Sequence, residues 1–287
     1  MKIVIIGIGY VGLSNAIVFM KSNQVSLVDT NLDKVNTINE KRSPIENKEY
    51  DKLIKKYKKN ISATNNLTVA LADADLVLVA VPTPLDNKTN RLDTTVVEEV
   101  INNVTSINSN VNIAIRSTLP IGTTRSLREK YKSNNIVYLP EFLREKTALQ
   151  DLYNPFRIVI GIDKKCKKSI QIAHVLGNLL ISSSTATHRK ICIMGLEEAE
   201  AVKLYSNAYL ATRLTFFNEL DKYASEHELN TKDIIDAICL DPRIGDTYNI
   251  PNKDGFGGKC LPKDVTDLST ETNSALLRSV VKSNNKK

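Results

Sequence analysis

Residues 255–264 read Gly-Phe-Gly-Gly-Lys-Cys-Leu-Pro-Lys-Asp, which places Cys260 directly after a glycine-rich stretch. Such a loop is an unusual place for a cysteine that serves only to pack a core. Lys259 and Lys263 flank it, and a helix that begins near Pro262 would bring the positive end of its dipole to the sulfur. These features favour a thiolate, so we predict that Cys260 is a nucleophile.

A second pair of polar residues lies in a long stretch of helical periodicity, residues 196–226. Lys203 and Asn207 are four residues apart and therefore share one helical face. An ammonium group and an amide on one face can stabilise negative charge that develops on a substrate oxygen. The alternative, a solvated surface lysine, stays open, although the neighbours on that stripe are apolar.

The chain begins with a short β-branched run, residues 2–6, followed by a glycine-rich turn and a helical pattern. In this position glycines permit a tight turn and close approach of the backbone to a pyrophosphate. Asp29 follows 17 residues after the turn, at the end of the next run. A carboxylate there accepts ribose hydroxyls and repels a 2′-phosphate, so we predict NAD, not NADP. The turn comprises Gly7, Gly9, Tyr10, Val11 and Gly12.

Three further motifs follow predicted strands and should therefore lie at the carboxyl edge of the sheet, where ligands bind in open α/β folds. The first contains Pro82 and Thr83, and the second, residues 116–120, contains Thr118. Taken singly, each could be a turn or a cap. The third, residues 140–145, has two glutamates one helical turn apart, which predicts a shared face for binding a ligand or water. Acidic residues that favour the start of a helix are the alternative.

The elements that must position these residues predict an α/β fold. Strand-like runs at residues 2–6, 25–29, 76–81, 112–116, 136–139 and 158–162 alternate with helical or loop segments. This alternation predicts a Rossmann-like, doubly wound, mostly parallel sheet over residues 1–195. Residues 196–287 should form an all-helical central domain, with helices at 196–226, 231–239 (capped by Thr231) and 273–282. The apolar face of helix 196–226 suggests a homodimer.

Composition narrows the class of protein. The chain has 287 residues, 42% of them hydrophobic, and a net charge of +7. The lysines are dispersed with few interleaved aromatics, which argues against nucleic acid as partner. No run reaches the roughly 18 apolar residues of a membrane span, and the apolar start is better explained by a buried strand than by a signal peptide, so we expect a cytoplasmic protein. The four cysteines are scattered without metal-ligand spacing, which predicts neither a metal site nor disulfides.

Together the motifs resemble those of the UDP-glucose/GDP-mannose dehydrogenase family. The resemblance rests on Gly-x-Gly-Tyr-Val-Gly, Pro-Glu-Phe-Leu-Arg-Glu, the Lys-x-x-x-Asn spacing and Gly-Phe-Gly-Gly-x-Cys-Leu-Pro-Lys-Asp, which occur in that order over nearly the whole chain. Residues 43–45 and 241–245 look most like those of bacterial members that use UDP-glucose. Members that use GDP-mannose or an N-acetylmannosamine nucleotide share these motifs, so the motifs leave the sugar open.

The resemblance implies two successive hydride transfers to NAD, which convert the C6 alcohol of UDP-glucose to the carboxylate of UDP-glucuronate. Cys260 would hold the aldehyde as a thiohemiacetal that becomes a thioester and is then hydrolysed. Lys203 and Asn207 would stabilise the oxyanion, and Asp264 with a water would act as base. Thr118 and Glu145 would orient the hydrolytic water.

The resemblance also implies binding residues beyond those of the glycine turn. The cofactor-binding residues would include Asp29, Lys34, Pro82, Thr83, Thr118, Glu145 and Lys263. The nucleotide sugar would meet Glu141, Phe142, Leu143, Lys203, Asn207, Arg243, Tyr248, Phe256 and Gly257, with Arg243 coming from the same or the partner subunit.

Two other functions compete with this interpretation. A β-hydroxyacid dehydrogenase has about this length, a Rossmann domain and a Lys-x-x-x-Asn helix, but needs no nucleophilic cysteine. A catalytically silent NAD-binding dimerisation protein is the second. The family continues into another nucleotide-binding domain after the last predicted helix, where this sequence ends. We therefore expect a chain with the catalytic residues but only part of the substrate site.

Overall fold

The computed structural model describes residues 1–185 and 190–285, so His188 and the last two lysines lie outside the description. The chain divides into two compact units. The first contains Met1–Thr83 and Thr94–Ala201, and the second contains Pro84–Asp93 and Val202–Lys287. The expected boundary after residue 195 falls slightly before this division, and the transfer of residues 84–93 to the second unit was not expected.

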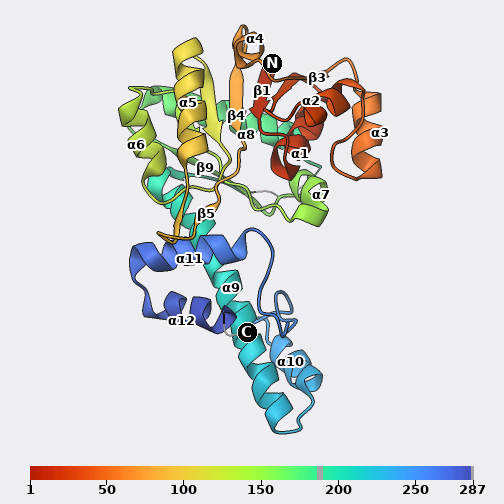
Figure 1. The fold of residues 1–287 in the computed structure, drawn as a ribbon, viewed down its shortest axis with the longest axis vertical. Coiled ribbons are helices and arrows are strands. Elements are labelled where there is room, and N and C mark those ends of the chain that lie inside the picture. Colours follow the sequence, from red (N-terminus) through yellow and green to blue (C-terminus); the bar gives the residue numbers. More distant parts are fainter. Residues whose placement is uncertain (186–189, 286–287) are drawn as a thin grey trace. The chain divides into compact units, whose positions relative to one another are not determined.

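The first unit is built on a sheet of eight strands within the described residues (Figure 1). Its order is β3-β2-β1-β4-β7-β8-β9-β10; the strands from β3 to β8 are parallel, and β9 runs antiparallel to β8. Their bounds are β1 (Lys2–Ile6), β2 (Gln24–Val28), β3 (Ile61–Thr64), β4 (Leu76–Val79), β7 (Asn112–Ile115), β8 (Ile136–Tyr138), β9 (Arg157–Ile162) and β10 (Lys190–Gly195). The predicted α/β fold is confirmed, although β3 and β10 had not been predicted. The order changes direction between β1 and β4, where such folds bind ligands.

Both faces of this sheet are covered. Ile3, Ile5 and Leu27 belong to a core cluster with residues of the helices on one face, whereas the alternate residues Val4 and Val77 are equally buried on the other. Burial on both faces explains why these strands read as continuous apolar runs. The helices of this unit are α1 (Tyr10–Phe19), α2 (Leu32–Asn39), α3 (Lys48–Lys56), α4 (Leu67–Leu71), α5 (Thr95–Ile107), α6 (Thr123–Lys130), α7 (Ala148–Tyr153) and α8 (Lys167–Ser183), with a 3-10 turn, η1 (Glu145–Thr147), before α7.

From residue 196 to residue 285 the chain is helical, as predicted. The long helix α9 (Leu196–Glu226), which begins in the first unit, has the expected bounds and is followed by α10 (Thr231–Cys239), α11 (Leu261–Thr272) and α12 (Ala275–Asn284). The predicted cap of α10 is wrong by one residue. The side chain of Asn230, not that of Thr231, accepts hydrogen bonds from the amides of Lys232 and Asp233.

A small hairpin, β5 (Leu85–Asp86) and β6 (Arg91–Leu92), belongs to the second unit because it binds α11. The guanidinium of Arg91 donates to Asp267 Oδ1 at 2.9 Å and to Glu271 at 2.8 Å. The amide of Leu92 donates to the same Asp267 oxygen at 2.9 Å. Asp267 is fully buried, so its carboxylate depends on these donors. Strands this short have no periodic pattern from which they could be predicted.

Candidate active site

The glycine turn lies between β1 and α1, and its three glycines are required for different reasons. Gly7 has a φ of +104°, and a Cβ there would lie 2.4 Å from the carbonyl oxygen of Ala80. A Cβ at Gly12 would lie 1.9 Å from the carbonyl oxygen of Gly7. A Cβ at Gly9, the N-cap of α1, would meet nothing within 4 Å. Packing therefore requires Gly7 and Gly12, whereas Gly9 leaves room for a phosphate at the start of the helix.

Asp29 is held beside this turn at the carboxyl end of β2. Its carboxylate accepts hydrogen bonds from the amide of Ile8 at 2.7 Å and from the amide of Asn31 at 2.9 Å. Lys34 Nζ lies 3.6 Å from Asp29 Oδ2. The two amides fix the orientation of the carboxylate next to the turn, as recognition of a dinucleotide ribose requires. These residues fit NAD.

The glycine turn yields a matched pair of predictions. Gly12→Ala should lower the free energy of unfolding by about 2 kcal/mol or more, because its Cβ overlaps backbone that cannot move freely. Gly9→Ala should leave the thermal midpoint within about 2 °C of the native chain while weakening NAD binding at least about tenfold. Thermal unfolding and titration calorimetry with NAD check both. Unchanged NAD affinity in Gly9→Ala would contradict the assignment.

The loops that follow β4 and β7 meet, as their place at the carboxyl edge predicted. Ser117 Oγ donates to the carbonyl of Val81 at 2.7 Å. Thr83 and Thr118 beside them are 5% and 9% exposed. Both threonines are thus almost completely buried, which a simple surface turn would not require.

Arg116 lies beneath this edge, and the sequence analysis assigned it no role. Its guanidinium donates to the carbonyls of Leu139 at 3.4 Å and Pro140 at 3.2 Å, and its Nε has no hydrogen-bond partner within the described residues. Burial lowers the pKa of Arg116 to about 10, an effect opposed by the charge of Glu141. The buried cation links the loop after β7 to the one after β8.

The predicted helical face containing Glu141 and Glu145 is wrong. Residues 141–144 are not helical, and only Glu145 begins the turn η1. The buried Glu141 carboxylate accepts the amide of Leu143 at 2.7 Å, an interaction that stabilises a local turn. Glu145 is exposed. The neighbouring Phe142 ring lies 4.1 Å from the guanidinium carbon of Arg157, and Leu143 packs against the core.

In the second unit, Cys260 is the N-cap of α11 and is partly exposed. The helix begins at Leu261 with Pro262 in its first turn, so the predicted helix start is confirmed. The amide of Asp264 donates to the Cys260 carbonyl at 3.0 Å, which places the two side chains one helical turn apart. None of the four cysteines, all of which lie in described parts of the chain, forms a disulfide.

A polar cluster surrounds Asp264, which is itself fully buried. Asn207 Nδ2 donates to Asp264 Oδ2 at 2.6 Å, and Lys263 Nζ lies 2.8 Å from Asp264 Oδ1. Lys203, one turn before Asn207 on α9, is only 3% exposed. The solvated-surface interpretation of Lys203 is therefore wrong. Two helices of this unit thus carry the polar groups. The helix α9 carries a buried lysine and an amide, and α11 with its N-cap carries a carboxylate and a cysteine.

The other predicted substrate residues of this unit have different surroundings. Arg243 is exposed and forms a forked ion pair with Asp241, with its Nη2 2.6 Å from Oδ2. Tyr248 has a φ of +53°, and both it and Gly257 are exposed. Phe256 is buried, and its backbone exchanges two hydrogen bonds with the Asn284 side chain, at 2.7 and 3.2 Å.

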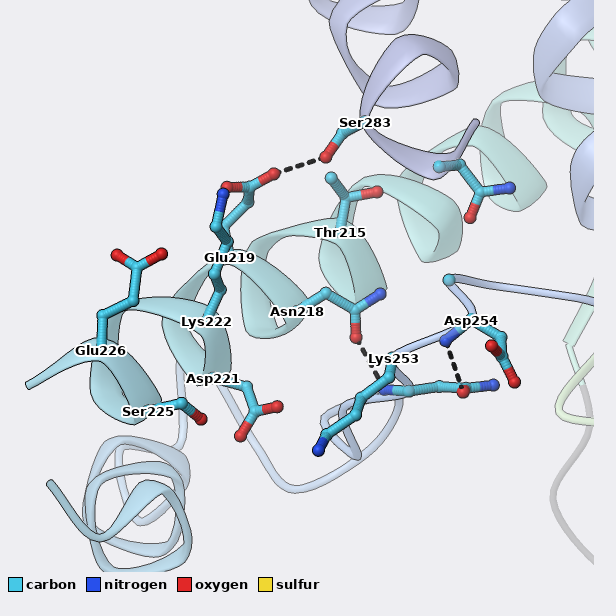
Figure 2. Close-up of a pocket in the computed structure, with 13 residues that line it drawn as sticks. Thr215, Asn218, Glu219, Asp221, Lys222, Ser225, Glu226, Lys253, Asp254 and Ser283 are labelled. Atoms are coloured by element: carbon cyan, nitrogen blue, oxygen red, sulfur yellow. Dashed lines mark hydrogen bonds between the residues drawn. The ribbon is translucent and has the colours of Figure 1, made fainter. Parts of the chain in front are cut away.

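A polar cavity of about 480 Å³ also lies in the second unit (Figure 2). It is bordered by the latter half of α9, by residues 252–254 and by the end of α12. There the amide of Asn252 donates to Asn218 at 2.8 Å, and Ser283 bonds Glu219. None of the predicted site residues lines it. In residues 1–185 and 190–285, no group of acidic, histidine or cysteine side chains could hold a metal ion, and none of the helices contains an apolar stretch of membrane-spanning length.

Comparisons with known proteins match both units. Residues 1–176 match the NAD binding domain of the UDP-glucose/GDP-mannose dehydrogenase family, and residues 197–286 match its central domain. A UDP-glucose 6-dehydrogenase of Campylobacter jejuni is 43% identical over 99% of this chain and 72% of its own length. One from Streptococcus pneumoniae is 39% identical over 99% and 73%, respectively. The structure of a UDP-glucose dehydrogenase from Pyrobaculum islandicum superposes with a TM-score of 0.88 at 28% identity, covering 98% of this chain and 67% of that one.

Proposed function

Since this chain belongs to the UDP-glucose/GDP-mannose dehydrogenase family, we propose that it oxidises the C6 alcohol of UDP-glucose to the carboxylate, using Cys260 as a covalent nucleophile. The arrangement around Asp264 is the observation that carries this proposal. It combines a cysteine at a helix start with a buried carboxylate, amide and lysine. When bound, NAD supplies the acceptor for one hydride in each of two oxidation steps.

Cys260 explains how one site can carry out both oxidations. After the first oxidation, the sulfur attacks the C6 aldehyde, and the carbonyl oxygen takes up a proton to give a thiohemiacetal. Loss of the C6 hydride and the hydroxyl proton leaves a thioester. Water then adds to the thioester carbon, and the carbon–sulfur bond breaks to release the acid and the thiol. Cys260 is the N-cap of α11, so the nucleophile lies at the positive end of that helix's dipole.

Asp264, Asn207 and Lys203 supply the proton transfer and the charge stabilisation. The Asp264 carboxylate is held by Asn207 at 2.6 Å and by Lys263 at 2.8 Å, which fixes the orientation of the proposed base. An amide nitrogen has two hydrogens, so Asn207 keeps a second donor for a substrate oxygen. Lys203, one turn earlier on α9, provides the positive charge for the oxyanion.

The proposed cofactor residues belong to the first unit, except for Lys263, which belongs to the second. NAD would be held at Gly9, Asp29 and Lys34, where the turn leaves room and the carboxylate is oriented. Thr83 and Lys263 would assist. Thr118 and Glu145 would orient the hydrolytic water.

UDP-glucose is proposed as the sugar because the two relatives that are 43% and 39% identical are both named UDP-glucose 6-dehydrogenases. Glu141, Phe142 and Leu143 in the first unit, with Arg243, Tyr248, Phe256 and Gly257 in the second, complete the proposed substrate residues. For Phe256 the contact would come through its backbone, because its side chain is buried.

An NADH assay tests this function. With NAD present, UDP-glucose should give two NADH per sugar, and UDP-glucuronate should appear by mass spectrometry. GDP-mannose and UDP-N-acetylmannosamine serve as comparison sugars, and a chain extended to the full length of the relatives as comparison enzyme. If NADH formed only with another of these sugars, that sugar would replace UDP-glucose as the proposed substrate. If neither chain binds the sugars by calorimetry or forms NADH, the silent NAD-binding alternative holds.

We also propose that the protein forms a homodimer through α9. Tyr205, Tyr209, Phe216 and Tyr223 are between 51% and 64% exposed. Their spacings of four, seven and seven residues place them on one stripe of the helix. An exposed aromatic stripe of this kind is typical of a surface that pairs with another helix. Light scattering should give the mass of two chains, and a monomer would contradict the proposal.

A further inference from the structure

The start of helix α6 has no cap of its own. Its N-cap is Gly122, which has a φ of +90° and no side chain to accept the first amides of the helix. Unsatisfied amides at a buried helix start are costly, so an acceptor must come from elsewhere. It comes from Glu200 in the first turns of α9, more than 70 residues further along the chain.

Glu200 accepts three hydrogen bonds from this turn. Its carboxylate oxygens lie 2.6 Å from the amide of Gly122, 2.8 Å from the amide of Thr124 and 2.6 Å from the Thr124 hydroxyl. Glu200 and Thr124 are both 0% exposed. The carboxylate thus satisfies the start of α6 and complements the positive end of its dipole.

The capped turn lies four residues after Thr118. Both belong to the loop of residues 116–122, between β7 and α6, which is called the Thr118 loop below. At the other end of this loop, Ser117 is bound to the carbonyl of Val81 at 2.7 Å. Between the two attachments, Leu119 is fully buried. The loop is therefore fixed at both ends, by β4 on one side and by Glu200 on the other.

We propose that Glu200 is a positioning residue, which holds the Thr118 loop in its active geometry by capping α6 from α9. The inference rests on the proposed function, in which Thr118 orients the hydrolytic water. Glu200 itself touches neither sugar nor cofactor in this scheme. Its effect on activity comes through the loop, so it should change kcat more than the KM for the sugar.

The charge state of Glu200 makes the cap on α6 dependent on pH. Burial raises the pKa of Glu200 to about 7, against the lowering effect of its three hydrogen bonds. The nearby charges are Glu197, which raises this pKa further and is paired with Arg125 of α6, and the more distant exposed pair of Lys164 with Glu198. Only the ionised form can accept all three hydrogen bonds. The cap should therefore weaken as the pH falls through about 7.

The contribution of Glu200 to the free energy of unfolding should change with pH in the opposite direction to the strength of the cap. The pKa of Glu200 is higher in the folded state than its ordinary value of 4.5, which applies to the unfolded chain. The stabilisation that Glu200 contributes is therefore complete below pH 4.5. It is lost as the pH rises towards about 7. A glutamine does not titrate, so the thermal stability of a Glu200→Gln variant, measured relative to that of the native chain, should rise from pH 5 to pH 8.

The test compares Glu200→Gln with Glu197→Gln, which removes a carboxylate one turn earlier whose ion pair with Arg125 is partly exposed. At pH 8, Glu200→Gln should lower kcat about tenfold with a smaller change in KM, and the difference should shrink at pH 6. Hydrogen exchange at the amides of residues 122–124 should become at least about tenfold faster. Glu197→Gln should change none of these values more than about twofold.

The exchange and stability measurements test the cap independently of the sugar, and kcat tests the positioning role. If the native chain forms no NADH, the proposed function fails, but faster exchange at residues 122–124 together with the pH-dependent stability gain still establishes the cap. Unchanged exchange in Glu200→Gln overturns the cap. Faster exchange with unchanged kcat at pH 8 overturns the positioning role and leaves Glu200 a structural residue.

Discussion

Serine in place of Cys260 is expected to reduce UDP-glucuronate formation by at least about a thousandfold, because a serine hydroxyl is far less nucleophilic than a thiolate near pH 7. The fold should survive, since Cys260 is the N-cap of α11 and serine is a favoured N-cap residue. NADH release and mass spectrometry of the sugar product would measure the loss. A covalent adduct of the sugar on the native protein, detected as added mass on the peptide containing Cys260, should disappear in the variant.

Cys166 offers a matched control. It is the N-cap of α8, so Cys166→Ser makes the same change in the same kind of position in the first unit. Burial raises the pKa of Cys166, but several hydrogen bonds, the first of them from the Ser169 amide, lower this pKa below its ordinary value. Its replacement should nevertheless leave turnover within about twofold of the native value. If Cys260→Ser retained full turnover, the β-hydroxyacid dehydrogenase alternative would be favoured.

Asp264→Asn is expected to slow turnover at least about a hundredfold, because it removes the proposed base. It should also lower the free energy of unfolding by about 2 kcal/mol, since an amide cannot satisfy the donors of both Asn207 and Lys263. Urea unfolding followed by circular dichroism measures the second effect. Steady-state kinetics between pH 6 and pH 9 measures the first.

A variant of Asp267 tests whether the loss of activity in Asp264→Asn follows only from the loss of stability. It is also fully buried on α11, and it binds Arg91 and the amide of Leu92. Asp267→Asn should therefore cost a similar amount of stability, about 2 kcal/mol, but change kcat no more than about threefold. If both variants lost activity in proportion to stability, Asp264 would be a structural residue and not the base.

The positions of the elements that carry these residues could be predicted locally. The apolar run of residues 2–6, the glycines after it and Asp29 are close in sequence, and their pattern follows directly from the geometry of a strand–turn–helix unit. The bounds of α9 were predictable for the same reason, because helical periodicity runs without Pro or Gly from 196 to 226. Cys260 could be singled out because a glycine-rich loop with a following helix start is itself a local pattern.

Contacts between distant residues were decided by the tertiary structure alone. The bond between Asn207 and Asp264 joins residues 57 positions apart, and the cap that Glu200 provides to Gly122 joins residues 78 apart. Whether a lysine such as Lys203 is solvated or buried depends on what packs over its helix. No local pattern contains that information.

The same distinction explains the errors. The spacing of Glu141 and Glu145 suited a helix, but the buried guanidinium of Arg116 and the Leu143 amide compete for the backbone and carboxylate of that segment. The hairpin at residues 84–93 is held by hydrogen bonds from Arg91 and the Leu92 amide to Asp267, which lies on a helix far along the chain. Sequence by itself determined the main strands and helices and the residues that could do chemistry. The tertiary structure determined the state of each side chain, since burial and hydrogen-bond partners arise only when distant segments meet.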